Sequence, residues 1–146
     1  MRDIAQENKA IILQFYEEME KKGNLDIIDE ILTTDCVLHF PGGVDIHGPE
    51  GYKEFRAPLD AALSGLKHSI EDMIVEGDKV VVRFILRGTY RGEFMGITPT
   101  GKQIMLTSIA IYRIAGDKVV EVWCNADDFG LFQQLGVISP IGPAEK

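Results

Sequence analysis

Two similar stretches of sequence, "EGDKVVVRF" (residues 76–84) and "AGDKVVEVW" (residues 115–123), decide the expected fold. In each, a Gly-Asp pair stands between runs of β-branched and aromatic residues, which is the pattern of a tight turn between two antiparallel strands. The segments that flank the two stretches do not match, so the repetition reflects shared turn chemistry and not an internal repeat. We therefore expect strand pairs at about residues 67–76 with 79–89 and 102–115 with 118–126.

The part of the chain before these strands is predicted to be largely helical. Apolar residues recur at 3.6-residue spacing from Ile4 to Met19, which predicts an amphipathic helix, and a short second helix is expected over "LDIIDEIL" (residues 25–32). A strand "DCVLHF" (residues 35–40) and a brief strand "VDIHG" (residues 44–48) follow, and Gly48-Pro49-Glu50 opens a third helix. The predicted apolar face of that helix comprises Tyr52, Phe55, Leu59, Leu63 and Leu66, and Pro58 is expected to kink or break it.

This order of elements, with helices first and a long antiparallel sheet afterwards, predicts an α+β fold. The three helices are expected to pack on one curved face of the sheet, because an antiparallel sheet commonly buries only one of its faces. A curved sheet closed by helices makes a cone with an internal cavity. Apolar cavities with a few polar groups are the usual binding sites for small molecules.

Size and charge restrict the class of protein. The chain has 146 residues, 45% of them hydrophobic, and a formal net charge of −8. This predicts a single domain over residues 1–146 and argues against nucleic acid and anionic membranes as partners. No apolar run is long enough to span a bilayer and the first residues lack the pattern of a signal peptide, so we expect a cytoplasmic protein. Cys36 and Cys124 are expected to be free thiols, and no metal site is expected.

The last predicted strand ends in polar residues, "WCNADD" (residues 123–128). With a period of two, Trp123, Asn125 and Asp127 share one face with Val119 and Glu121. Trp offers a flat apolar wall, Asn can hold a substrate oxygen, and a carboxylate whose pKa is raised by burial can act as a general base. Asp127 is therefore a catalytic candidate, and Trp123 and Asn125 are substrate-binding candidates. The alternatives are that one of the two Asp residues only caps the following helix, and that Trp123 is a core residue.

Further candidates come from the first half of the chain. His39 in "VLHF" (residues 37–40) is either a core histidine with one satisfied nitrogen or an acid or base that faces the pocket. Tyr16 is either a core residue or a hydrogen-bond donor to a ligand, since a buried hydroxyl needs a partner. Phe40, on the opposite face of the strand from His39, joins the substrate-binding candidates. His47 and His68 are expected to be exposed.

Three long segments together resemble the SnoaL-like polyketide cyclase family, in its ester cyclase branch, of the nuclear-transport-factor-2-like superfamily. They are "NKAIILQFYEEMEKKGNLDIIDEIL" (residues 8–32), "VEGDKVVVRFILRGTYRGEFMGITPTGKQI" (residues 75–104) and "YRIAGDKVVEVWCNADDFGLFQQLG" (residues 112–136). The resemblance covers about residues 8–136 and leaves residues 137–146 as a C-terminal tail.

The resemblance implies a cone-shaped α+β domain, a pocket between sheet and helices, and a homodimer formed through the sheet. In the characterised cyclases a single Asp acts as acid and base in an intramolecular aldol ring closure, without a metal or a cofactor. By motif position that residue corresponds to Asp127, the histidine of the first strand to His39, and the aromatic residue of the first helix to Tyr16.

The sequence thus leads to a small cofactor-independent enzyme of the cyclase, lyase or isomerase type. In this hypothesis Asp127 moves a proton next to a carbonyl group of a hydrophobic small molecule, while Asn125, His39 or Tyr16 steadies the enolate oxygen. The alternative is a non-catalytic module of the same fold that binds a small molecule or mediates dimerisation.

Overall fold

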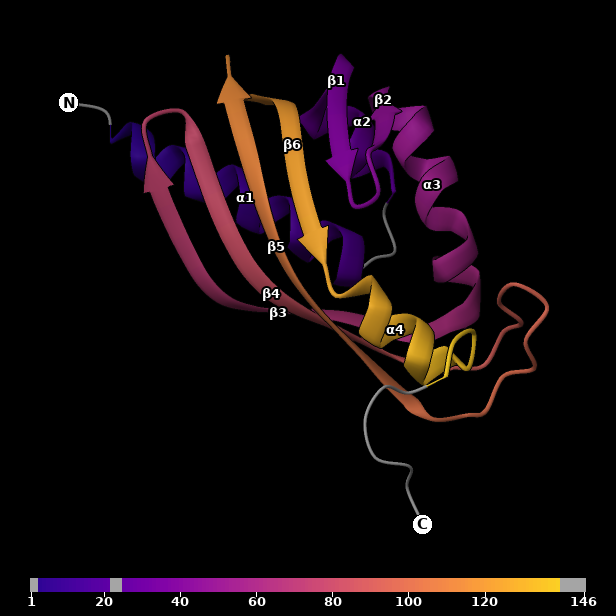
Figure 1. The fold of residues 1–146 in the computed structure, drawn as a ribbon. Coiled ribbons are helices and arrows are strands. Elements are labelled where there is room, and N and C mark those ends of the chain that lie inside the picture. Colours follow the sequence, from indigo (N-terminus) through magenta and orange to yellow (C-terminus); the bar gives the residue numbers. More distant parts are fainter. Residues whose placement is uncertain (1–2, 22–24, 140–146) are drawn as a thin grey trace.

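The structure of the protein is a computed structural model that describes residues 3–21 and 25–139 (Figure 1). Its first half contains α1 (Ile4–Lys21), α2 (Asp26–Ile31), β1 (Leu32–Phe40), β2 (Val44–His47) and α3 (Gly48–Ala62). Its second half contains β3 (Leu63–Glu76), β4 (Lys79–Tyr90), β5 (Gln103–Ala115), β6 (Lys118–Ala126) and α4 (Asp128–Leu135). Residues 140–146 of the expected tail lie outside the described residues.

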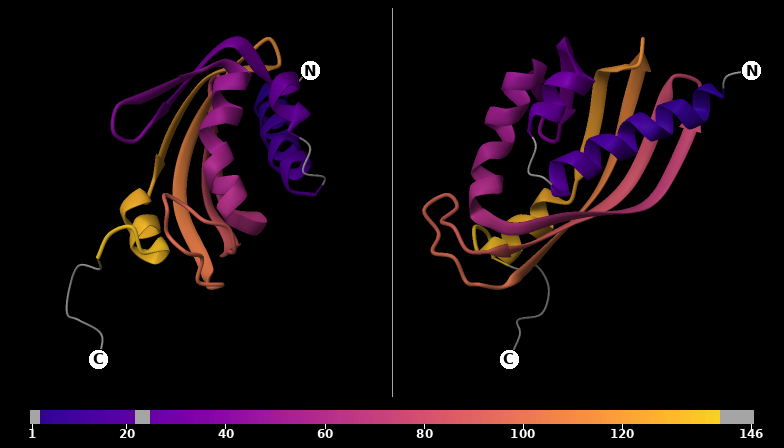
Figure 2. Two further views of the ribbon diagram at one scale, coloured as in Figure 1. Left: turned by 90° about the vertical axis from the view of Figure 1, so that its right-hand side faces the viewer. Right: turned by 180° about the vertical axis from the view of Figure 1, so that it is seen from behind.

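The six strands form one curved, open sheet in the order β2-β1-β6-β5-β4-β3. Neighbouring strands are antiparallel except β1 and β6, which run parallel. The two views in Figure 2 show that α1 and α3 lie on the same side of the sheet, over its concave face. The predicted α+β fold, with a curved sheet and helices on its concave face, is confirmed.

Both Gly-Asp turns occur where the sequence predicts them. Gly77 and Asp78 join β3 to β4, and Gly116 and Asp117 join β5 to β6. Gly77 has a φ of 60°, and Gly116 and Asp117 have φ values of 58° and 64°. Two-residue hairpin turns need positive φ at the first or at both central residues, because only then does the turn match the twist of the strands.

The main core lies between α1 and the concave face of the sheet. α1 buries Ile12, Phe15, Tyr16 and Met19 along the face that the 3.6-residue period predicts. Burying a large apolar side chain stabilises the fold by roughly 1.5–3 kcal/mol each. The sheet residues of this core are Leu32, Cys36, Leu38, Val80, Val82, Phe84, Ala110, Tyr112, Ile114, Val119 and Val122.

The third helix differs from its prediction in two ways. It ends at Ala62, so Leu63 and Leu66 belong to β3 and not to the apolar face of the helix. It also continues through Pro58, which removes the hydrogen bond to the carbonyl of Glu54. Both Pro58 and Glu54 are exposed, so water can satisfy that carbonyl and the helix does not break. None of the helices among the described residues is long and apolar enough to cross a membrane.

A β-bulge in β6 changes the alternation that the sequence suggests. Arg113 pairs with Glu121, but the next residue, Ile114, pairs with Val119, so Val120 is the additional residue on β6. As a result Val119 and Val122 are both buried. The prediction that Val119 shares a face with Trp123 is therefore wrong.

α4 continues the sheet where β6 ends. β6 pairs with β5 only as far as Ser108, which leaves the other half of β5 without this neighbour. There the side-chain amide of Gln134 accepts from the backbone N–H of Met105 and donates to its carbonyl, both at 2.8 Å. The Gln134 amide thus takes the place of the backbone of a neighbouring strand, and it holds α4 against the edge of β5.

Candidate functional site

The concave interior contains a buried pair of tyrosine hydroxyls. Tyr16 from α1 and Tyr112 from β5 are 4% and 6% exposed, and their hydroxyl oxygens are 2.5 Å apart. The rings of Phe15 and Phe84 surround them. Burial raises the pKa of both tyrosines well above the ordinary value, so both hydroxyls stay protonated. The pair uses one of its two hydroxyl hydrogens internally and retains the other as a donor.

A cavity of about 370 Å³ lies beside this pair, between the C-terminal end of α1, α3 and the start of β3. The ring centroid of His68 in its wall is 5.0 Å from that of Tyr16, although neither tyrosine lines the cavity itself. Its volume is within the range of small-molecule sites, roughly 300–1,000 Å³. Its polar lining residues are Glu20, Arg56, Asp60 and His68, and its larger apolar ones are Met19, Leu25, Leu63 and Leu66.

Glu20 and His68 approach each other in the wall of this cavity without forming a hydrogen bond. Their side chains are 20% and 10% exposed, and Glu20 Oε1 lies 3.3 Å from His68 Nδ1. Neither atom has a hydrogen-bond partner within the part of the chain that the structure describes. Burial lowers the pKa of His68 to about 4 and raises the pKa of Glu20. The imidazole is therefore neutral at neutral pH.

Arg56 supplies the positive charge of the cavity. Its Nε donates to Asp60 Oδ2 at 2.8 Å and its Nη2 donates to Oδ1 at 3.3 Å, one helical turn along α3. Its Nη1 donates to the sulfur of Met19 at 2.8 Å, and a thioether is a weak acceptor. The guanidinium also lies over the ring of Tyr52, 5.5 Å from the centroid. One N–H of this fixed group could therefore exchange a weak acceptor for a stronger one.

Asp127 and Asp128, at the end of β6, have different surroundings. Asp127 is exposed and caps α4, accepting a hydrogen bond from the backbone N–H of Gly130 at 3.0 Å. Asp128 is half-buried and precedes the buried Leu131 and Leu135 by three and seven residues, so all three share the inward face of α4. Burial raises the pKa of Asp128, and the charge of Asp127 raises it further. Asp128 is thus the inward carboxylate of the pair.

The side chain of Cys124, near the end of β6, faces the interior of the fold. It packs against the main core, and it is close enough to interact electrostatically with Asp128 and with the interior tyrosines Tyr16, Tyr52 and Tyr112. Burial, together with the charge of Asp128, raises the pKa of Cys124 to about 12. Like Cys36, it is a free cysteine, and at neutral pH it remains a thiol.

His39 and Trp123 lie on the outer face of the sheet, because their neighbours Leu38 and Cys124 point into the core. The two nitrogens of His39 contact Asp45 Oδ1 at 2.8 Å and Glu121 Oε2 at 2.7 Å, and its ring stacks on Trp123. Hydrogen bonds to Glu121 and to Asp45 raise the pKa of His39. The imidazole is therefore part of an ion-pair network at the surface.

The predicted site residues do not all converge. Tyr16 and Phe40 lie on the concave side, where Phe40 packs against Tyr52 and Phe55. Asn125 is exposed on the outer side with His39 and Trp123. His39 pairs with Trp123, four residues before Asp127, so roughly 13 Å of strand separates Asp127 from the level of His39. The cavity between α1, α3 and β3 is lined by none of these predicted residues.

Glu20 and His68 are functional candidates that the sequence did not single out. The expectation that His68 is exposed is wrong. A signal exists for each: Glu20 follows Tyr16 by four residues and so lies on the same helical face, and His68 alternates with the inward Ile70. Both signals are weak, because a charged or polar residue at the margin of an apolar face is usually exposed.

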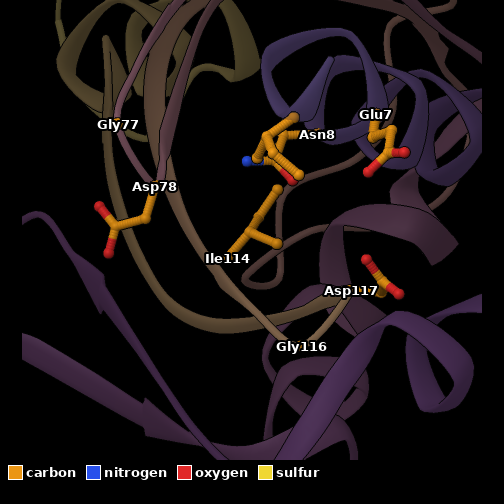
Figure 3. A pocket seen from close by; sticks show the side chains of 8 residues that line it. Glu7, Asn8, Gly77, Asp78, Ile114, Gly116 and Asp117 are labelled. Carbon is orange, nitrogen blue, oxygen red and sulfur yellow. The ribbon is translucent and has the colours of Figure 1, made fainter. Parts of the chain in front are cut away.

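A second cavity, of about 400 Å³, lies between the start of α1 and the two Gly-Asp turns (Figure 3). The carboxylates of Asp78 and Asp117 lie on opposite sides of Ile114 there and do not point towards one another. Across residues 3–21 and 25–139, no three His, Cys, Asp or Glu side chains are placed to hold a metal ion. We take the first cavity as the candidate site, because it combines acidic, basic and imidazole side chains.

The curved sheet with helices over its concave face and an inward acid at the end of the last strand defines a domain of the nuclear-transport-factor-2-like fold. Within this fold, the sequence model of the SnoaL-like polyketide cyclase family matches residues 10–135, and the chain belongs to that family.

Solved structures of similar proteins agree with this assignment. A candidate polyketide cyclase from Acidithiobacillus ferrooxidans is 30% identical with a TM-score of 0.78, over 93% of this chain and 99% of that chain. IdmH, a candidate polyketide cyclase from Streptomyces antibioticus, is 28% identical with a TM-score of 0.79, over 88% and 98%. AclR, a candidate hydroxylase from Streptomyces galilaeus, is 25% identical with a TM-score of 0.83, over 94% and 86%. No curated protein matches the chain.

Proposed function

We propose that the protein is a small enzyme of the cyclase or isomerase type in which Asp128 transfers a proton next to a carbonyl group. The observation that carries this proposal is the half-buried carboxylate of Asp128 on the inward face of α4, with its pKa raised by burial and by Asp127. A carboxylate that is poorly solvated is a stronger base and can take a proton near neutral pH. Family membership supports the same class of reaction.

The tyrosine pair is the proposed partner of the acid. Removing a proton next to a carbonyl leaves a negative charge on the carbonyl oxygen, and hydrogen-bond donors fixed in an apolar interior stabilise such a charge most strongly. Tyr16 and Tyr112 have one hydroxyl hydrogen that their mutual bond does not use. In this proposal Asp127 keeps α4 in place as its cap, and no cofactor takes part in the proton transfer.

The proposed substrate is a neutral, largely hydrophobic molecule. The interior is lined mainly by aromatic and aliphatic side chains, and the charged groups Arg56 and Asp60 of the cavity pair with each other. A ligand of this kind gains binding free energy mainly from burial of its apolar surface.

Exchange of the hydrogens next to the carbonyl tests the proposal. A panel of aryl ketones and β-keto esters is incubated in D₂O with the protein, and deuterium incorporation is followed by ¹H NMR. We expect the wild type to accelerate exchange for at least one member, and Asp128→Asn to lower that rate by about 10²–10⁴-fold. Asp127→Asn is the matched comparison: Asn also caps helices well, so this variant should show only the smaller effect of removing the neighbouring charge from Asp128. The proposal fails if no member exchanges faster, or if Asp128→Asn exchanges as fast as the wild type.

A non-catalytic binding module of the same fold is the second candidate. The observation that favours it is that helix capping accounts for Asp127, the residue to which the resemblance assigned the acid role. Such a module would bind the ketones without exchanging their hydrogens, and Asp128→Asn would leave their affinity unchanged.

We also propose that the outer face of the sheet forms a homodimer. Met105 and Ile109 are apolar, yet they are 46% and 49% exposed on this face. The strand that carries them, β5, lies in the middle of the sheet. Ile109→Lys should convert a dimer to a monomer in light scattering, because a charge in the centre of an apolar interface is costly. Leu13→Lys, at an exposed position of α1, should leave the mass unchanged. A monomeric wild type would refute the homodimer.

A further inference from the structure

Glu20 Oε1 and His68 Nδ1 are two buried polar atoms for which the described part of the chain provides no hydrogen-bond partner. Buried polar atoms in native proteins are nearly always paired, because an unpaired one loses its bonds to water and gains nothing in return. Here two of them lie 3.3 Å apart in the wall of one cavity. Because both atoms are buried, a polar group of a bound molecule has to enter between the two side chains to reach them, and there a single group can satisfy both.

The chemistry of the two atoms restricts that group. A carboxylate only accepts hydrogen bonds, whereas a neutral imidazole donates from one nitrogen and accepts at the other. An anionic group would be repelled by Glu20, because Arg56, the cation of the same cavity, is already paired with Asp60. A hydroxyl group fits both requirements, because it donates its hydrogen to Glu20 and accepts one from His68.

The rest of the cavity wall indicates what carries the hydroxyl. Met19, Leu25, Leu63 and Leu66 supply apolar surface, and the volume of about 370 Å³ is at the lower end of the range for small-molecule sites, roughly 300–1,000 Å³. The Nη1 of Arg56, held against the sulfur of Met19, can serve a second oxygen of the same ligand. These features together describe a small, mostly apolar molecule with a hydroxyl group at one end.

We propose that this cavity binds the hydroxyl group of an apolar small molecule, such as a phenol or a hydroxylated aromatic ketone, between Glu20 Oε1 and His68 Nδ1. The proposal goes beyond the proton transfer assigned to Asp128 and does not depend on it. It concerns recognition of the ligand's polar end, at the C-terminal end of α1.

Two ketones that differ only in the hydroxyl group test the proposal. The affinities of 6-hydroxy-1-tetralone and 1-tetralone are measured by calorimetry or NMR titration. We expect the hydroxylated compound to bind roughly tenfold more tightly, since it forms two hydrogen bonds to groups that are otherwise unpaired. His68→Phe and Glu20→Leu should each reduce this preference to less than about twofold. Glu71→Gln, an exposed change on the strand that carries His68, should preserve it.

A second measurement uses the wild type alone, in case either variant fails to fold. The ¹⁵N signal of His68 Nδ1 should shift on addition of 6-hydroxy-1-tetralone and not on addition of 1-tetralone. Equal affinity for the two ketones, no binding of either at millimolar concentration, or no selective shift would overturn the proposal and leave water as the occupant. Asp128→Asn separates this outcome from the proposed function, because it should slow the exchange while the preference for the hydroxyl group persists.

Discussion

His68 on the concave face and His39 on the outer face belong to the same sheet, yet their surroundings shift their pKa values in opposite directions. His68 is 10% exposed, and burial lowers its pKa to about 4. His39 lies between Glu121 and Asp45, whose hydrogen bonds raise its pKa. The comparison shows that the concave interior is poorly solvated and favours the neutral form of a titratable group, whereas the outer face stabilises the charged form. Function that depends on a desolvated acid or a neutral ligand therefore belongs to the interior.

The largest expected effect is a loss of stability in mild acid that depends on His68. The folded state binds the His68 proton with a pKa of about 4, while the unfolded chain binds it at about 6.5, so the unfolded state gains protons first as the pH falls. The contribution of His68 is complete above pH ~6.5 and is lost as the pH falls towards 4, by about 3 kcal/mol in total.

This loss can be measured by urea unfolding between pH 4 and 7.5. His68→Phe should have a flatter dependence of the unfolding free energy on pH. Both proteins are compared in a Glu20→Gln background, because the raised pKa of Glu20 contributes stability that is lost as the pH rises, which is the opposite sign. Identical pH profiles with and without His68 would show that the interior does not exclude charge.

His39 gives the matched comparison on the outer face. Its raised pKa means that its contribution is present below pH ~6.5 and is lost as the pH rises through the folded-state value. His39→Gln should therefore change the pH dependence of the unfolding free energy in the opposite direction to His68→Phe. The effect should be smaller, because the ion pairs of His39 are partly exposed to solvent.

The tyrosine pair offers a smaller test of the interior. Tyr16→Phe or Tyr112→Phe leaves the other hydroxyl buried without its partner, which should cost roughly 1–3 kcal/mol of unfolding free energy. The loss of unfolding free energy in the double variant should be clearly smaller than the sum of the losses in the two single variants, because the double variant contains no unpaired buried hydroxyl. Urea unfolding of the four proteins measures the coupling. Additive losses would mean that the two hydroxyls do not depend on each other.

Much of the fold could be predicted because it follows from local patterns. The two Gly-Asp turns fix the hairpins, and the 3.6-residue period of α1 correctly identifies its buried face, including Tyr16. The bulge at Val120 could not be predicted, because it depends on how β6 pairs with β5. The end of α3 was misplaced for a related reason: Leu63 and Leu66 fit a helical face and a strand equally well, and the pairing of β3 with β4 decides between them.

The site was less predictable than the fold, since it depends on which way single side chains point. The sequence identified the polar end of β6 but left open whether Asp127 or Asp128 faces inwards. The start of α4 settles this, because Asp127 is its cap and Asp128 shares the face of Leu131. Glu20 and His68 come together only through the packing of α1 on β3, a contact between segments more than 40 residues apart that no local pattern reveals.

The most direct test of Asp128 as the acid and base is a carboxyl ¹³C NMR titration of this residue in the wild type and in Asp127→Asn. We expect Asp128 to titrate above the ordinary value of 3.8, and its pKa to fall when the neighbouring charge of Asp127 is removed. A pKa of Asp128 at or below 3.8 in the wild type would contradict the central claim that the inward carboxylate at the end of β6 is desolvated and able to act as the acid and base.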